Sequence, residues 1–310
     1  QEITKDYSGA ERMMLRAIRI NPVHTDSLSH YGTFLGKVHQ NYAASNVIYD
    51  RVLSIDPLHV NTICNKGLVT QVTSRNPDEA EAFYMRALAA DPAHSPTYGF
   101  LGLLLHSTKK NFTAAQEAYE TSIRLLPSDA TVLSNYGHLL FEHRNNHSGA
   151  ESAYRDSLRA DPLHPPALTN YGILLEDVHQ DYRGALRMYK RALEVEPTNP
   201  ATRCQYALLL TNFEHDFDQA ESLLMAGIVE EEDDNPTSKI CNGELRHCLL
   251  AIKDTRKTIT TQKLTPIQEA ARKELERRRL NKVAASRRAR RLQCLSESQS
   301  PRAYSDAGLA

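Results

Sequence analysis

Six prolines stand at intervals of 35 residues along most of this chain, and no other feature of the sequence restricts its fold as strongly. Three further positions keep the same phase: one holds glycine, one tyrosine and one alanine. A fixed period of this length is typical of repeat architectures, in which each unit is one supersecondary motif. The positions are Pro22, Pro57, Pro92, Pro127, Pro162 and Pro197; Gly32, Gly67, Gly102, Gly137, Gly172 and then Ala207; Tyr49, Tyr84, Tyr119, Tyr154 and Tyr189; Ala80, Ala115, Ala150, Ala185 and Ala220.

Each unit predicts a pair of helices. In one unit, Leu168, Tyr171 and Leu175 recur at the spacing of a helical apolar stripe. The unit's proline ends the second helix, because it disfavours helical geometry in the residue before it. The second helix of the same unit carries a stripe of Ala185, Met188, Tyr189, Ala192 and Leu193. Neither helix can bury its stripe alone, so we expect an all-α solenoid in which neighbouring units cover one another.

These residues resemble the tetratricopeptide repeat (TPR), which has Trp, Leu-Gly, Tyr, Ala, Phe, Ala and Pro at set offsets. A 35-residue period also occurs in pentatricopeptide repeats, but the Ala-to-Pro spacing fits the tetratricopeptide pattern better. One departure is an extra residue in the turn between the two helices. The resemblance covers residues 7–229 and implies a right-handed α-solenoid whose first helices line a concave groove. The Trp place is held by Leu28, Ile63, Tyr98, Leu133, Leu168 and Arg203.

We predict a TPR array over residues 1–229, with a partial first unit at 7–24 and six units from about residue 25. The partial unit supplies only a second helix, so an apolar end should be exposed. Lys66 and Thr70 stand at normally apolar places, and we expect the second unit to pack loosely.

Beyond the array, the acidic run at 230–236 breaks the phase and predicts a linker. A helix at 237–260 follows, with Leu245, Cys248, Leu249 and Ile252 on one face. We expect this amphipathic helix to cap the solenoid.

The candidate binding residues of the array lie on the predicted first helices. The residue before the Tyr-Gly position is His30, Asn65, Phe100, Asn135, Asn170 and Gln205 in successive units. This is similar to the asparagine ladder of the tetratricopeptide part of O-GlcNAc transferase, which implies contacts with a peptide backbone, because an amide both donates and accepts hydrogen bonds. The alternative is a solvated or inter-helix role for these residues.

Acidic residues gather toward the end of the later first helices, at Glu142, Glu176 and Asp177. They favour a basic ligand in the groove, and a solvated acidic face is the alternative. His24, His59, His94 and His164 share one position with Asp129 and Asn199, which indicates a helix N-cap. They should not share a metal ion, because whole repeats separate them. No catalytic motif or cofactor site is evident, so we expect a protein that is not an enzyme.

The formal net charge of -1 hides a basic segment, since residues 263–291 hold eleven Lys or Arg against three acids. We predict one long basic helix at 264–293 and a disordered tail at 294–310. Part of it resembles the basic region of basic leucine-zipper factors, which implies contacts with DNA or RNA, yet the expected zipper leucines are Gln299 and Asp306. Alternatives are a nuclear import signal, a solvated helix, or a segment that binds the chain's own acidic groove. The residues concerned are Arg277, Arg278, Arg279, Asn281, Lys282, Arg287, Arg288, Arg290 and Arg291.

Five scattered cysteines and the lack of an apolar membrane span predict reduced thiols and no membrane insertion. We expect a cytoplasmic protein, or a nuclear one if the basic segment is an import signal. The predicted function is a non-catalytic scaffold that binds an extended peptide or a helix of a partner protein in its groove. The alternative is a nucleic-acid-associated regulator, in which the basic helix contacts DNA or RNA while the array recruits proteins.

Overall fold

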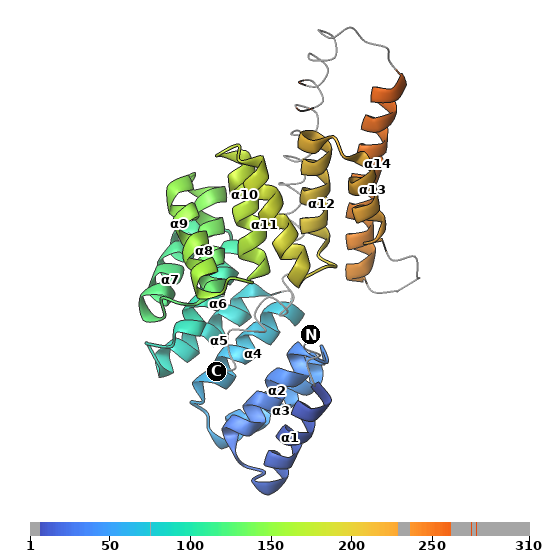
Figure 1. Ribbon diagram of the computed structural model, residues 1–310. Coiled ribbons are helices and arrows are strands. Elements are labelled where there is room, and N and C mark those ends of the chain that lie inside the picture. The colour runs from blue at the N-terminus through green and yellow to red at the C-terminus, as the bar shows by residue number, and fades with distance from the viewer. Residues whose placement is uncertain (1–6, 75, 229–235, 262–273, 275–276, 278–310) are drawn as a thin grey trace. The chain divides into compact units, whose positions relative to one another are not determined.

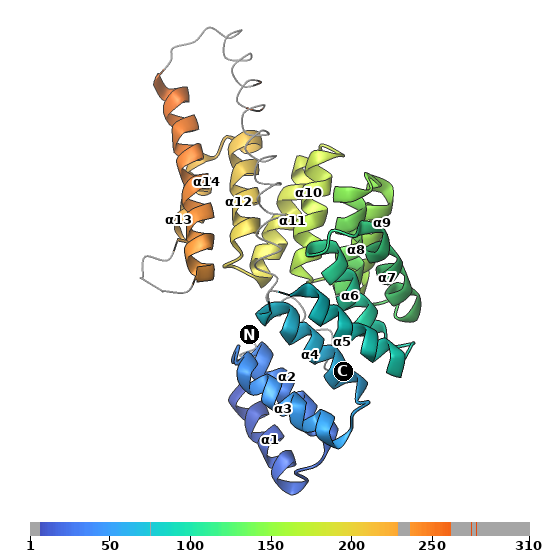
Figure 2. The same cartoon turned by 180° about the vertical axis from the view of Figure 1, so that it is seen from behind.

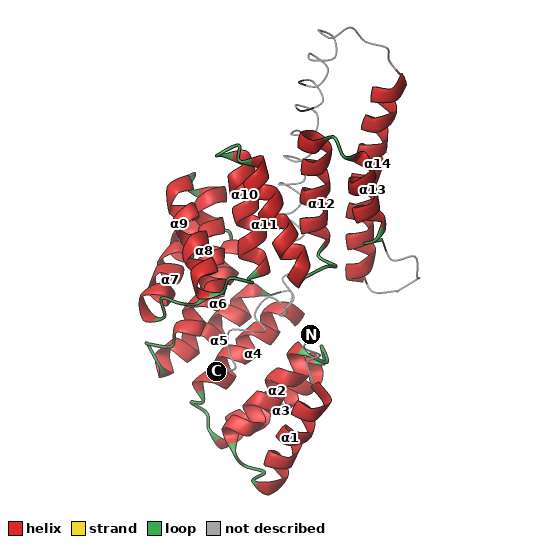
Figure 3. Cartoon of the chain, in the orientation of Figure 1, coloured by secondary structure: helices red, strands yellow, loops and turns green. Residues whose placement is uncertain are grey.

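The computed structural model describes residues 7–74, 76–228 and 236–261 and the single residues 274 and 277. Every element in this described part of the chain is a helix (Figure 3). The contacts between Cα atoms divide the described residues into two compact units. Unit 1 ends at Leu139 and unit 2 begins at Leu140.

In each unit the helices follow one another as antiparallel neighbours, as the views from both sides show (Figures 1 and 2). The helices of unit 1 are α1 (Tyr7–Ile20), α2 (Thr25–Lys37), α3 (Tyr42–Ile55), α4 (Val60–Thr73), α5 (Pro77–Ala90), α6 (Ser95–Ser107), α7 (Phe112–Leu125) and the first part of α8 (Ala130–His143). Those of unit 2 are the end of α8, α9 (His147–Ala160), α10 (Pro165–Asp177), α11 (Tyr182–Val195), α12 (Pro200–Leu209), the short π-helix η1 (Leu210–Glu214), α13 (Phe217–Met225) and α14 (Pro236–Thr261).

The periodic prolines lie in the turns between repeats, as predicted. Pro57, for example, follows the end of α3 at Ile55 and precedes the start of α4 at Val60. The second helices begin at side-chain N-caps that accept a backbone N–H, which satisfies one of the donors that a helix start leaves open. The capping residues are Asn41, Asn76, Asn111, Asn146, Asp181 and Asp216.

The extra residue in each turn adopts a left-handed conformation immediately before the N-cap. Its φ lies between 52° and 56° in the five turns where it is described, and none of these residues is glycine. Most L-residues avoid this region, because Cβ crowds the neighbouring carbonyl group. A period of 35 instead of 34 therefore has a definite structural origin in this chain. The residues are Gln40, Lys110, Asn145, Gln180 and His215.

In the four repeats where the contact is described, the core contains a tyrosine ring of the second helix that packs onto a glycine of the first. The sixth repeat has Ala207 and Leu224 at these two places. All five periodic tyrosines are at most 1% exposed. A Cβ built on Gly67 would lie 2.7 Å from Cε1 of Tyr84, and one on Gly172 would lie 2.6 Å from Cε1 of Tyr189. Only glycine leaves this space, which is why the two residue types recur in the same phase.

The expectation that the second repeat packs loosely is wrong. Ile63 is fully buried and Thr70 is 7% exposed. Lys66 is accommodated at the edge, because its ammonium group pairs with Asp50 and lies 5.6 Å from the ring centroid of Phe83. The polar residues of this repeat thus find partners and leave the core closed.

The two ends of the described array differ. No residue of α1 is buried, and Met13 and Ile20 are 68% and 76% exposed, so the predicted apolar end is present. At the other end, α14 places Leu245, Cys248 and Ile252, each at most 1% exposed, in one apolar cluster with residues of α12 and α13.

The buried arginine of unit 2 holds the last repeat together. Arg203 stands at the Trp place and is 8% exposed. Its Nε donates to the carbonyl of Pro197 at 2.6 Å and its Nη1 to the carbonyl of Leu223 at 2.7 Å. Burial lowers the pKa of the guanidinium group, and the two carbonyl oxygens compensate for lost hydration.

We predict that Gly67→Ala lowers the free energy of unfolding by roughly 1–3 kcal/mol, because the new Cβ would overpack the ring of Tyr84. Gly243→Ala is the matched control, since this glycine is also helical but nothing lies within 4 Å of its Cβ. The control should be neutral or stabilise by at most about 1 kcal/mol. Urea unfolding followed by circular dichroism measures both; equal effects would contradict the tyrosine–glycine packing.

Candidate functional site

The predicted groove residues all lie on first helices of the repeats. Unit 1 holds His30 on α2, Asn65 on α4 and Asn135 on α8; of these His30 is exposed and the two asparagines are half-buried. Unit 2 contributes Glu142 at the end of α8, then Asn170, Glu176 and Asp177 on α10 and Gln205 on α12. Only Asp177 is exposed in that set, and the other four are half-buried.

The contacts of Asn65 show what this position does in the first repeats. Its Nδ2 donates to Oγ1 of Thr33 on the preceding first helix at 3.1 Å. The Thr33 hydroxyl in turn donates to the carbonyl of Ser29 at 3.0 Å. Asn65 therefore has an inter-helix role, and it keeps a second amide N–H and its Oδ1, for which the described residues offer no hydrogen bond.

Glu176 points into the repeat and not only toward solvent. The hydroxyl of Tyr189 donates to its Oε2 at 3.0 Å. Burial raises the pKa of this carboxyl to about 7, against the lowering effect of the Tyr189 hydrogen bond and with a smaller contribution from Asp177. At neutral pH Glu176 is thus about half protonated, and the acidity of this face rests more on Asp177 and Glu142.

Three of the four histidines that follow the prolines cap the next helix with their side chains. Nδ1 of His24, His59 and His164 accepts the N–H three residues on, while His94 contacts the Thr97 hydroxyl at 2.7 Å. The ring also reaches the preceding repeat, which the sequence analysis did not foresee. Nε2 of His59 lies 3.0 Å from Asp26 Oδ1, and Nε2 of His94 lies 2.9 Å from Asn61 Oδ1. A histidine can thus cap one helix and bond to the repeat before it.

Arginines near the ends of three second helices form another link that the sequence analysis missed. Each donates from Nη2 to the carbonyl of the proline of the preceding repeat, at 2.7 to 2.8 Å. The sequence contains a signal for this link, because Arg51 and Arg86 stand 35 residues apart and Arg191 keeps the same phase. The pairs are Arg51 with Pro22, Arg86 with Pro57 and Arg191 with Pro162.

Most of the predicted basic site lies outside the described residues. Arg277 is described, and its Nη1 lies 3.6 Å from the carboxylate of Glu274. Residues 278–291, which include the other eight residues of the predicted site, are outside the described part. The same holds for the linker residues 230–235 and the tail at 294–310.

Within the described residues, no group of three or more His, Cys, Asp or Glu side chains is placed to hold a metal ion. No helix in the same residues is both long enough and apolar enough to cross a bilayer.

Comparison with protein families gives a direct match to the repeat. A family model described as the tetratricopeptide repeat matches residues 104–165, and a second model of the same description matches residues 61–94. The chain contains tetratricopeptide repeats. A sequence search of the curated proteins gives no match.

Solved structures with TPR-like similarity support the same fold. Pseudomonas aeruginosa pilF is 21% identical, with a TM-score of 0.56 over 65% of this chain and 89% of that one. The structure of the APC/C hetero-tetramer Cut9–Hcn1 is 14% identical, with a TM-score of 0.63 over 77% of this chain and 46% of that one. This chain thus spans about half the length of the latter. Both likenesses concern the TPR fold alone.

Glu176 should make the stability of the TPR array depend on pH. Its folded pKa of about 7 exceeds the ordinary value of 4.5, so the folded state favours the protonated form. The resulting destabilisation is small near pH 4.5, grows as pH rises from 4.5 to about 7, and then levels off. We predict that Glu176→Gln raises the free energy of unfolding by about 1–3 kcal/mol at pH 8 and by clearly less at pH 5.

The reciprocal variant serves as the control for this prediction. Gln71 occupies the equivalent place in the second repeat and accepts a hydrogen bond from Tyr84 at 2.9 Å. Gln71→Glu should therefore destabilise the chain more at pH 8 than at pH 5. Urea unfolding at both pH values measures the differences from wild type, and a pH-independent difference for Glu176→Gln would show that its carboxyl is solvated.

Proposed function

We propose that this chain is a non-catalytic scaffold that binds a segment of a partner protein along the first helices of its repeats. One observation carries the proposal: in four of the repeats a half-buried carboxamide occupies the same first-helix position. These residues are Asn65, Asn135, Asn170 and Gln205. Amide groups that recur at one register can bond to both the N–H and the carbonyl groups of an extended peptide.

The acids of unit 2 give the proposed ligand a preferred charge. Glu142 and Asp177 occupy the same place at the ends of the first helices α8 and α10, and Asp177 is exposed. A basic or N–H-rich segment is the complement of such a surface, and its attraction should weaken at high salt. The Cut9–Hcn1 hetero-tetramer is an example of a similar fold in an assembly of two kinds of chain.

Capture of partner proteins tests the scaffold. The full chain and a truncated chain that ends at Lys263 should retain the same partner proteins from a native lysate, identified by mass spectrometry. Capture by the truncated chain at background level would contradict the proposal.

Charge reversal then locates the surface. Glu142→Lys combined with Asp177→Lys should reduce recovery of that partner at least tenfold, because two like charges replace two complementary ones. Glu194→Lys is the matched control, since it reverses an exposed acid on α11, the second helix of the same repeat as Asp177. Equal losses for the two variants would place the binding surface elsewhere.

The alternative function is that of a nucleic-acid-associated regulator, and it is favoured by the excess of Lys and Arg at residues 263–291. Under this alternative, the full chain should shift the fluorescence anisotropy of a labelled duplex DNA or single-stranded RNA. The affinity should fall steeply with added salt, and the chain that ends at Lys263 should lose it. Equal binding by both chains would exclude the basic segment as the contact.

A further inference from the structure

The hydroxyl groups of the buried tyrosines meet different partners in different repeats. Tyr84 donates to Gln71 Oε1 at 2.9 Å, and Tyr189 donates to Glu176 Oε2 at 3.0 Å. Both acceptors stand four residues after the glycine on which the ring packs. In these two repeats the chain's own side chain ends in an oxygen that fills the space beside the tyrosine hydroxyl.

The first repeat lacks that side chain, because the equivalent residue is Gly36. Its tyrosine, Tyr49, turns to Thr33 instead, and the two oxygens lie 3.1 Å apart. Since the Thr33 hydroxyl donates to Ser29, the Tyr49 hydroxyl is the donor of this pair. The place of Thr33 is taken by Leu68 and Ile173 in the repeats that have the longer side chain.

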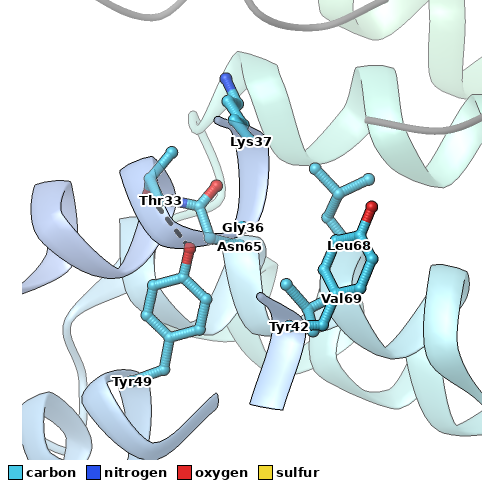
Figure 4. A pocket seen from close by; sticks show the side chains of 8 residues that line it. All are labelled: Thr33, Gly36, Lys37, Tyr42, Tyr49, Asn65, Leu68 and Val69. Atoms are coloured by element: carbon cyan, nitrogen blue, oxygen red, sulfur yellow. Dashed lines mark hydrogen bonds between the residues drawn. The ribbon is translucent and has the colours of Figure 1, made fainter. Parts of the chain in front are cut away.

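A pocket opens where the side chain is missing, between α2, α3 and α4 (Figure 4). Its cavity volume is only about 10 Å³, and the empty space of about 260 Å³ around it includes open solvent. Leu68 and Val69 supply apolar lining, and the polar ends of Tyr49, Thr33 and Asn65 lie together on the other side. A cavity this small admits only the terminal atoms of one side chain, while the rest of that side chain lies at the open mouth.

The polar groups in the pocket match a particular chemistry. The second amide N–H of Asn65 makes no hydrogen bond to the described residues and can donate to an oxygen. The Tyr49 hydroxyl can rotate from Thr33 toward the same oxygen, as the hydroxyls of Tyr84 and Tyr189 already point toward theirs. Lys37 also lines the pocket, and Figure 4 shows its amino group turned away from Tyr49 and Asn65.

We propose that this pocket receives the end of a glutamine or glutamate side chain from a partner protein, in the place that Gln71 and Glu176 fill in their own repeats. The oxygen of the incoming group accepts from Asn65 and Tyr49, and its methylene groups contact Leu68 and Val69. Gln71 and Glu176 in the other repeats are thus examples of the side chain that we expect this pocket to bind. This inference rests on the proposed binding of partner segments, but it concerns one subsite that small probes can test separately.

The experiment titrates the full chain with blocked amino acids and follows the methyl resonances of Leu68 and Val69 by NMR. The probes are the N-acetyl methylamides of glutamine, glutamate and leucine. The glutamine and glutamate probes should shift these methyl signals in a saturable way, in the millimolar range expected for so few atoms. The leucine probe should not. No saturable shift, or an equal shift with leucine, would overturn the proposal.

Substitutions of Gly36 provide the matched pair. Gly36→Gln should fill the pocket from within and abolish the shifts. Gly36→Ala should keep them, because a Cβ there meets Ser45 Oγ at 3.3 Å but leaves the end of the pocket open. Shifts that survive Gly36→Gln in a folded protein would contradict the assignment.

Two further measurements keep the test decisive if Gly36→Gln does not fold. An intermolecular NOE in wild type must connect the probe's methylene protons with the Leu68 methyls, and its absence at saturation overturns the proposal. Gln71→Gly opens the equivalent place in the second repeat, but Phe100 stands where Asn65 does in the first, so the probes should bring no saturable shifts at Leu103 and Leu104. Failure of all probes, beside intact capture of a partner protein, would reject this pocket while leaving the scaffold in place.

Discussion

The contact between a tyrosine ring and a glycine backbone is the constraint on which the rest of this structure depends. The ring of the second helix lies where any Cβ of the first helix would be, at 2.6 to 2.7 Å in the repeats measured. This contact fixes how closely and in what register the two helices pair, because a side chain in place of the glycine would push them apart. The tyrosine–glycine contact determines the geometry within a helix pair. The proline turns, the caps and the hydrogen bonds between repeats then connect one pair to the next.

The tyrosine–glycine contact does not fix the hydrogen-bond partner of the tyrosine hydroxyl group. The tyrosine ring is buried in the first five repeats, but its hydroxyl meets Thr33 in the first, Gln71 in the second and Glu176 in the fifth. A neutral amide, a titrating carboxyl and an open pocket therefore occupy equivalent places in one array. Repeats that are alike in their apolar core thus differ in the chemistry that they offer at the ends of their first helices.

The sequence predicts the helix pairs, their turns and the core positions, because these follow from local periodicity and from single residues such as Pro57. The sequence predicts fewer of the hydrogen bonds and ion pairs between repeats. The bonds of Arg51 and Arg86 to proline carbonyls join residues about one repeat apart. The expectation of loose packing in the second repeat failed for the same reason, since Lys66 is satisfied by Asp50 of the preceding helix. For the predicted groove the sequence gives positions but not orientations: Glu176 turns inward to Tyr189.

The left-handed residue before the second helix makes the turn inside a repeat conformationally unfavourable. Gln40, Lys110, Gln180 and His215 hold a backbone conformation that is unfavourable for an L-residue by roughly 1–2 kcal/mol. The backbone of each of these turns is therefore in an unfavourable conformation. The packing of the two helices that the turn joins keeps it there. Glycine would relax the bend but would also loosen the unfolded chain, which cancels part of the gain. The stability of the array therefore comes from its helix interfaces, which offset the unfavourable backbone conformation of the turns within the repeats.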